Sequence, residues 1–189
     1  MTSEPIPYRP ESDFTPPRDD CPHPHHWHAD TAGATETEVV ELIGSLVRAL
    51  QPDLVIETGV LHGTTTRAIG EALARNGHGR LHALEIDERY AQEAARAVAH
   101  LPVTVHQRPS TTFVPPAPID LAFLDSSLEA RPQELIDFAP YMHDRTIIVV
   151  HDTGPQHPVR ASIAPVADKL GFTLLDLPTP RGLTIGRRQ

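Results

Sequence analysis

The sequence has only one cysteine, Cys21, among its 189 residues. No disulfide can therefore form within the chain, and a zinc site built from several cysteines is excluded. The sequence also lacks a long apolar run, because no stretch approaches the roughly 20 residues that a membrane-spanning helix needs. The opening residues, MTSEPIPYRP, have neither the basic start nor the apolar segment of a secretory signal. We therefore expect a cytoplasmic protein.

Basic residues are few relative to acidic ones. The chain has 16 Lys and Arg against 25 Asp and Glu, which gives a formal net charge of -9. Such a surface repels phosphate backbones, so we do not expect a nucleic acid as partner. The length suits one domain with a full-sized core, and the 39% of hydrophobic residues fall in runs, as in a packed domain.

Residues 1–30 differ in composition from the rest of the chain. Seven of the 20 prolines lie within the first 24 residues, and proline removes backbone donors and favours extended conformations. We therefore predict an arm or lid here, followed by one domain at residues 31–189. The arm ends in a cluster of rings: His23, His25, His26, Trp27 and His28. Such a cluster can bind a metal or stack on a flat substrate, or it is simply a polar arm rich in histidine.

From residue 35 onward, helical and strand patterns alternate. Thr35 and Glu38 fit a capping box, and apolar residues at helical spacing predict a helix that ends near Leu50. We expect the apolar face of this helix to pack in the core, and a contact between the two chains of a homodimer is the alternative.

The remaining elements follow from the same patterns. Further helices are predicted at 64–75, 88–100, 132–142 and 159–170. Strands are predicted at 53–57, 80–86, 103–106, 119–125, 146–151, 172–177 and 183–185, the last two as an antiparallel pair. Continuous apolar strands separated by helices indicate a Rossmann-like, doubly wound α/β fold with a mostly parallel, seven-stranded sheet.

Ligands of such sheets bind beyond the carboxyl ends of the strands. The first strand ends in Glu57 and leads into a loop that contains Gly59 and Gly63. Two glycines four residues apart allow a sharp turn and close approach to a ligand, and the next helix presents free N–H groups. A carboxylate at Glu57 would repel a phosphate, so the loop suits a cationic ligand better. An ordinary glycine turn between strand and helix is the alternative.

The second strand ends in an acidic residue, and its separation from this loop in the sequence is informative. Glu85 lies 22 residues after Gly63, where a carboxylate can accept hydrogen bonds from both ribose hydroxyls of an adenosine. The alternative for Glu85 is a solvated carboxylate in a loop.

Together these motifs resemble the class I S-adenosylmethionine-dependent methyltransferases. The segment 53–66 is similar to their first motif, and 84–87 is similar to their ribose-binding motif. The segments 120–125 and 147–153 resemble their fourth and fifth strand ends. The Asp-Thr ending is similar to small-molecule O-methyltransferases of the catechol type and to the neighbouring cephalosporin-hydroxylase-like group. The similarity extends over residues 35–186.

The resemblance implies a set of cofactor contacts. The implied residues are Glu57, Gly59, Gly63, Thr65, Glu85, Ile86, Ser110 and Asp125. Those of the glycine loop would lie at the methionine end of S-adenosylmethionine, with Thr65 near its carboxylate. Glu85 would hold the ribose, while Ile86 and Ser110 would contact the adenine. Asp125 would lie near the sulfonium and the substrate, so the resemblance implies methylation of a small molecule, with oxygen as the expected acceptor.

The resemblance also implies a cation. In catechol-type relatives, carboxylates after the fourth and fifth strands and an adjacent amide bind a divalent metal. Asp125 and Asp152 stand at these positions, but Thr153 replaces the amide. The two carboxylates are therefore candidate ligands of an ion such as Mg²⁺. Alternatively, they serve as a cofactor contact and a loop cap.

Two residues are candidates for the catalytic role, Asp125 and His151. His151 has three readings: a general base, a metal ligand, or a histidine packed at the end of a strand. Relatives often carry a histidine or an aromatic residue directly after the first aspartate, whereas this chain has Ser126 and Ser127. The usual base is therefore absent or comes from elsewhere, such as the arm.

Two rival functions remain open at this stage. A nicotinamide-dependent oxidoreductase would need a G-x-G-x-x-G turn, which the loop after Glu57 does not supply. A non-catalytic nucleotide-binding or metal-binding module would keep the fold without the chemistry, and the serines after Asp125 motivate that reading.

Overall fold

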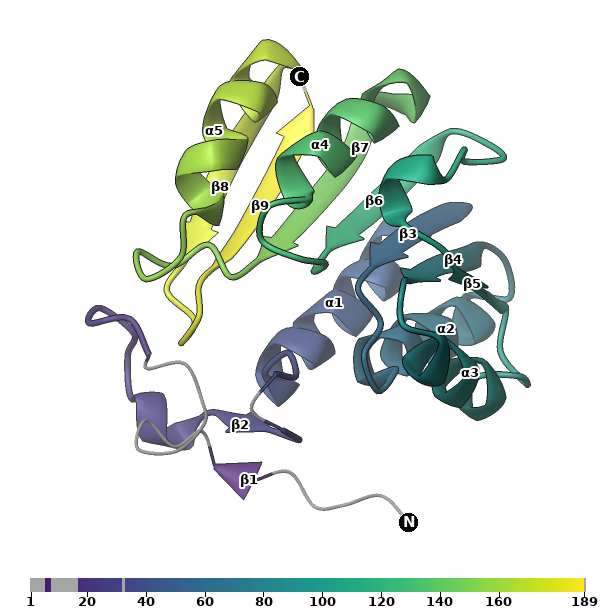
Figure 1. The fold of residues 1–189 in the computed structure, drawn as a ribbon, viewed down its shortest axis with the longest axis horizontal. Coiled ribbons are helices and arrows are strands. Elements are labelled where there is room, and N and C mark those ends of the chain that lie inside the picture. The colour runs from purple at the N-terminus through teal and green to yellow at the C-terminus, as the bar shows by residue number, and fades with distance from the viewer. Residues whose placement is uncertain (1–5, 8–16, 32, 189) are drawn as a thin grey trace.

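The computed structural model describes residues 6–7, 17–31 and 33–188. Seven strands form one sheet in the order β5-β4-β3-β6-β7-β9-β8 (Figure 1). They are β3 Leu54–Thr58, β4 Arg80–Glu85, β5 Val103–Gln107, β6 Ile119–Leu124, β7 Met142–His151, β8 Phe172–Leu177 and β9 Leu183–Arg188. The strands from β5 to β7 are parallel, whereas β9 lies antiparallel to both β7 and β8. The predicted Rossmann-like sheet is therefore confirmed.

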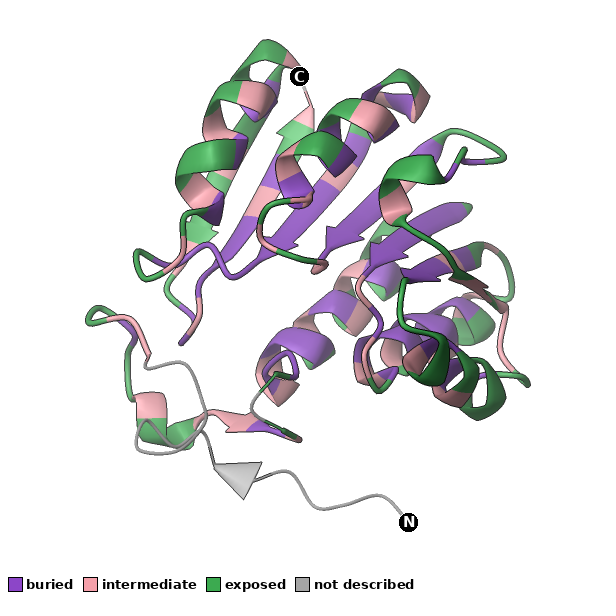
Figure 2. Ribbon diagram, in the orientation of Figure 1, coloured by how far each residue is buried: buried purple, intermediate pink, exposed green. Residues whose placement is uncertain are grey.

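Within the described residues, five α-helices cover the two faces of the sheet. They are α1 Thr37–Leu50, α2 Thr64–Asn76, α3 Glu88–Ala97, α4 Arg131–Phe138 and α5 Val159–Lys169. Successive strand residues point to opposite faces. Leu54 and Ile56 of β3 accordingly pack with α4 and α5, while Val55 packs with α1 and α2. The central strands are buried along most of their length (Figure 2), as expected for a sheet covered on both faces.

Two local predictions were wrong. The helix predicted at 132–142 ends earlier, because Met142 pairs with Ile119 as the first residue of β7 and the chain must leave the helix before it. A short 3-10 helix, η3 Ala139–Tyr141, makes this transition. The capping box does not form either. Glu36 is the N-cap of α1 without a side-chain cap, and the Thr35 hydroxyl instead donates to Asp125.

The N-terminal segment lies near the carboxyl ends of the parallel strands (Figure 1). The strand β2 His28–Ala29 pairs with β1 Ile6–Pro7 and follows a one-turn helix, η1 Pro24–His26. The His28 amide donates to Glu38, and the Thr64 hydroxyl donates to Asp30 at 3.1 Å. Residues 1–5 and 8–16 of the predicted arm lie outside the described residues. No helix in the described part of the chain is long and apolar enough to cross a membrane.

Candidate active site

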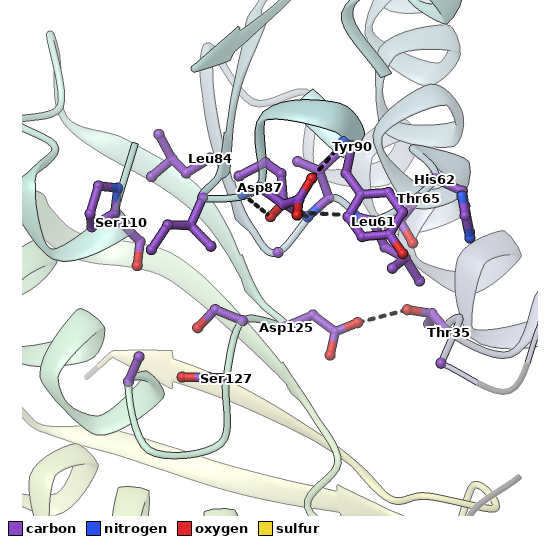
Figure 3. Close-up of a pocket in the computed structure, with 18 of the residues that line it drawn as sticks. Thr35, Leu61, His62, Thr65, Leu84, Asp87, Tyr90, Ser110, Asp125 and Ser127 are labelled. Atoms are coloured by element: carbon purple, nitrogen blue, oxygen red, sulfur yellow. Dashed lines mark hydrogen bonds between the residues drawn. The ribbon is translucent and has the colours of Figure 1, made fainter. Parts of the chain in front are cut away.

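A cavity of about 390 Å³ opens beyond the carboxyl ends of β3, β4 and β6 (Figure 3). This volume lies within the roughly 300–1,000 Å³ usual for small-molecule sites. The chain builds β4 and β5 on one side of β3 and then crosses to β6 on the other side. The cavity therefore lies at the switch point of the sheet, where α/β proteins of this type bind ligands.

The two glycines of the first loop are required by the packing of the chain. Gly59 has a φ of 78°, and a Cβ there would lie 2.2 Å from the carbonyl oxygen of Asp125. Gly63 has a φ of 77°, and its Cβ would lie 3.1 Å from that of Ala94 in α3. No L side chain fits the first position without moving backbone. The glycines thus let this loop approach the chain after β6 and the helix α3, and Gly59 also lines the cavity.

Glu85 ties this loop to the end of β4. One of its carboxylate oxygens accepts hydrogen bonds from the amides of Val60 and Leu61, at 2.9 and 3.0 Å. The other oxygen accepts from the Asp87 amide at 2.9 Å. Leu61 has a φ of 48°, which is uncommon for leucine, so the bond to Glu85 holds a strained turn. The carboxylate borders the cavity and has acceptor capacity left beyond these three bonds.

An exposed apolar side chain follows Glu85. Ile86 is 69% exposed and lines the cavity. Ser110 of the short helix η2 Ser110–Thr112 lines it as well, as Figure 3 shows. A branched apolar side chain left open in a pocket offers a surface on which a flat ring can pack.

Glu57 does not face the cavity. It lies in β3, fully buried, and neither carboxylate oxygen has a donor in hydrogen-bonding geometry within the described chain. Burial raises the pKa of Glu57, the nearby Thr66 hydroxyl offsets part of this, and Asp125 and Glu85 raise it further, to about 8. Glu57 is therefore a neutral acid at neutral pH, beside the loop that it was predicted to join.

Glu134 of α4 is a buried acid that sequence reasoning missed. Its carboxylate accepts hydrogen bonds from the hydroxyls of Thr58 at 2.9 Å, Ser126 at 2.6 Å and Ser110. Burial raises the pKa of Glu134, and the three hydroxyls offset part of that rise. The carboxylate thereby joins the end of β3, the loop after β6 and η2. The sequence signals this residue only weakly. Glu134 lies four residues before Phe138 and therefore on the apolar face of the same helix.

At the cavity wall, the carboxylate of Asp125 contacts three side chains. One carboxylate oxygen accepts from the Thr35 hydroxyl at 2.7 Å. The other lies 3.1 Å from Nδ1 of His151 and 3.0 Å from Nη2 of Arg131. On its other side, His151 lies with Nε2 2.6 Å from the carboxylate of Glu36. Both ring nitrogens of His151 therefore face carboxylates.

Asp152 completes this cluster from the end of β7. It lies 3.0 Å from Nη2 of Arg131 and 2.6 Å from Nε of Arg181. Burial raises the pKa of Asp152, but His151, Arg181 and Arg131 lower it well below its usual range. Its φ of 55° is in the left-handed region, which aspartate tolerates better than most residues.

The charges of the cluster balance. Burial lowers the pKa of His151, but Asp125, Glu36 and Asp152 outweigh this and raise it to about 10. Burial likewise raises the pKa of Glu36, and His151 reverses the shift to a net lowering. The imidazolium and two guanidiniums thus offset three carboxylates. This charge cluster consists of Glu36, Asp125, Arg131, His151, Asp152 and Arg181.

The structure brings most of the predicted cofactor residues together. Six of them line the cavity: Gly59, Thr65, Glu85, Ile86, Ser110 and Asp125. Glu57 and Gly63 lie outside the wall that the described residues form. His151 and Asp152 lie behind Asp125 rather than in this wall.

A possible ion site exists on geometry alone. Asp125, His151 and Asp152 each offer one ligand atom, and these atoms lie within 4.8 Å of one another. However, Arg131 already contacts both carboxylates, so the donor set as it stands fits a divalent ion poorly. The predicted metal contacts stay a prediction.

Comparison with known proteins identifies the family. The family model described as a methyltransferase domain matches residues 56–153, just over half of the chain. The chain therefore belongs to this methyltransferase domain family. No curated protein sequence matches it.

Solved structures share the fold. The O-methyltransferase TomG from Streptomyces achromogenes, solved with S-adenosylmethionine, aligns with a TM-score of 0.69 and 21% identity over 84% of this chain and 82% of that chain. A putative caffeoyl-CoA O-methyltransferase from Staphylococcus aureus aligns with a TM-score of 0.72 and 15% identity, over 82% and 85%. The O-methyltransferase from Bacillus cereus, in complex with SAH, aligns at 0.70 and 17%, over 84% of each chain.

Proposed function

We propose that this chain is an S-adenosylmethionine-dependent methyltransferase that methylates a small molecule, with a hydroxyl oxygen as acceptor. The observation that carries the proposal is the meeting of Gly59, Glu85 and Ile86 around one cavity at the switch point of the sheet. Membership of the methyltransferase domain family supports it. So do structural neighbours that are O-methyltransferases solved with S-adenosylmethionine or SAH.

The residues of the cavity fit this cofactor. Glu85 would accept hydrogen bonds from the ribose hydroxyls with the acceptor capacity that its backbone bonds leave free. Ile86 and Ser110 would contact the adenine. Thr65 and the free amides at the start of α2 would hold the carboxylate of the methionine part.

When bound, the cofactor supplies a methyl group on a cationic sulfonium. The protein then has to orient the acceptor, exclude water and accept the proton of the hydroxyl. Asp125 directly follows β6, and it lines the cavity. We assign it the role of orienting the acceptor hydroxyl and receiving its proton. Because both nitrogens of His151 are engaged by carboxylates, this residue positions Asp125 and is disfavoured as the base.

Calorimetry tests the cofactor. We expect one molecule of S-adenosylmethionine or SAH to bind per chain, and no binding at millimolar concentration would contradict the proposal. Transfer of labelled methyl to a panel of hydroxylated small molecules tests the reaction. Binding without transfer to any acceptor would favour the non-catalytic module. Binding of a nicotinamide cofactor instead would favour the alternative function of an oxidoreductase, which the family match disfavours.

The remaining expectations stay predictions about the whole protein. A net charge of -9 favours a small molecule over nucleic acid as partner. We propose that residues 1–30 act as an arm over the site, because Asp30 binds Thr64 at the cavity wall. A cytoplasmic location and a homodimer are likewise predicted.

A further inference from the structure

One cationic nitrogen lies between the two carboxylates that were predicted to bind a metal. Nη2 of Arg131 is 3.0 Å from an oxygen of Asp125, 3.0 Å from an oxygen of Asp152 and 2.7 Å from the backbone oxygen of Ser126. The other two nitrogens of the guanidinium are also bound. Nε donates to the same Ser126 oxygen at 3.0 Å, and Nη1 donates to the backbone oxygen of His151.

Three oxygens around a positive centre, two of them from carboxylates, are also the surroundings that a hard divalent cation takes. We propose that Arg131 is a built-in cation that takes the place of a divalent ion, so that this site is complete without metal. The side chain is only 2% exposed, and a guanidinium keeps its charge in proteins. Its charge is therefore a fixed part of the site.

The cations already present support this inference. The guanidiniums of Arg131 and Arg181 lie against Asp125 and Asp152. An added divalent ion would have to enter a buried group of charges that already holds these two cations, and it would have to displace a bound arginine. Neither step is favourable, because a buried charge left without its partner is costly. The electrostatic attraction that normally draws an ion to a pair of carboxylates is thus already satisfied.

The replacement changes what the site can do. A metal can lower the pKa of a hydroxyl by binding its oxygen directly. Arg131 lies outside the cavity wall that the described residues form and touches Asp125 instead. It is therefore a positioning residue, which acts by fixing the carboxylate that faces the acceptor. This positioning role rests on the proposed function, whereas the inference that the site binds no metal does not.

Manganese binding tests the inference without cofactor or substrate. The electron paramagnetic resonance signal of free Mn²⁺ is measured as the ion is titrated into the wild-type chain and into the Asp152→Asn variant. We expect the two titrations to coincide. One ion per chain that binds the wild type and is lost in Asp152→Asn would overturn the inference. This comparison needs no change at Arg131.

Removing the guanidinium gives the complementary test. In Arg131→Ala we expect one Mn²⁺ per chain to be gained, and to be lost again in Arg131→Ala with Asp152→Asn. Circular dichroism shows whether each variant is folded, and a folded Arg131→Ala chain that gains no ion would contradict the inference. If Arg131→Ala does not fold, the wild-type comparison still decides. Failure of the cofactor to bind would count against the proposed function alone.

Discussion

The hydroxyl of Thr35 donates a 2.7 Å hydrogen bond to the carboxylate of Asp125, which lies 90 residues away in the sequence (Figure 3). Thr35 belongs to the segment between the N-terminal arm and α1, and Asp125 follows β6. Both residues line the cavity. The bond therefore joins the segment after the arm to the carboxylate that we place beside the methyl acceptor.

Thr35→Val should slow methyl transfer while leaving the cofactor in place. The variant keeps the shape of the side chain and removes the donor, so Asp125 loses one of the bonds that fix it. A hydrogen bond to a charged group is worth roughly 1.5–3 kcal/mol, so we expect kcat to fall about tenfold or more. The Kd for SAH should change by less than about threefold, because the substitution leaves the proposed contacts with the cofactor in place.

The same substitution at Thr37 is the control. Thr37 is the first residue of α1 and is not part of the cavity wall formed by the described residues. Thr37→Val should leave kcat close to that of the wild type. An unchanged kcat in Thr35→Val would show that the bond does not position Asp125 for the reaction.

Glu85→Ala should weaken cofactor binding strongly. The change removes the proposed ribose acceptor and also frees the amides of Val60 and Leu61, which shape the glycine loop. Loss of two charge-assisted bonds predicts an increase in Kd of about 100-fold or more, measured by calorimetry with SAH.

Asp87→Ala is the matched control for Glu85. It removes a carboxylate from the same wall of the cavity, and it also removes the side chain that caps the N-terminus of α3. Loss of such a cap lowers the free energy of unfolding by about 1 kcal/mol. We expect a lower midpoint of thermal unfolding with a nearly unchanged Kd. Equal affinities of Glu85→Ala and the wild type would rule out the ribose role.

Glu57→Gln should make the chain more stable at alkaline pH. The pKa of Glu57 is raised from 4.5 in the unfolded chain to about 8 in the fold. Between these values the unfolded state releases a proton that the folded state keeps, so wild-type stability falls as the pH rises. The slope is at most about 1.4 kcal/mol per pH unit. The glutamine cannot ionise and removes this loss.

Urea unfolding at several pH values between about 5 and 8 measures this effect. The gain in stability of Glu57→Gln over the wild type should grow with pH. Glu129→Gln, at an exposed position, changes the same charge and should show no such growth. A gain that is independent of pH would mean that Glu57 is ionised in the folded state.

His151 should be an imidazolium throughout the neutral range. Because its pKa is raised from 6.5 to about 10 in the fold, its contribution to stability is fully present below about pH 6.5. That contribution is lost as the pH rises through about 10. Nitrogen-15 NMR of a histidine-labelled sample, with the signal assigned by a His151→Gln variant, should show both ring nitrogens protonated at pH 8. Deprotonation near pH 6.5 would restore His151 as a general base.

The local sequence determined the fold and indicated six of the residues that line the cavity. Apolar runs of strand length and helical spacing are signals of short range, and they placed the seven strands of the large sheet and the five helices that cover it to within a few residues. Gly59 and Glu85 were found because the ends of parallel strands meet at one edge of the sheet. For Gly59, however, the close contact that requires glycine is with the chain after β6.

Only the tertiary structure decided how the charged residues pair. Glu36, Arg131 and Arg181 come from three distant segments, and nothing in their immediate neighbours distinguishes them from solvated charges. Thr35 has the sequence of a helix cap, yet its hydroxyl binds a carboxylate that folding brings beside it, because a charge-assisted bond is stronger than a neutral one. In the same way, only folding brings the guanidinium of Arg131 into contact with both Asp125 and Asp152. Which charge compensates a buried carboxylate depends on distance in space, and the sequence encodes that distance only through the whole fold.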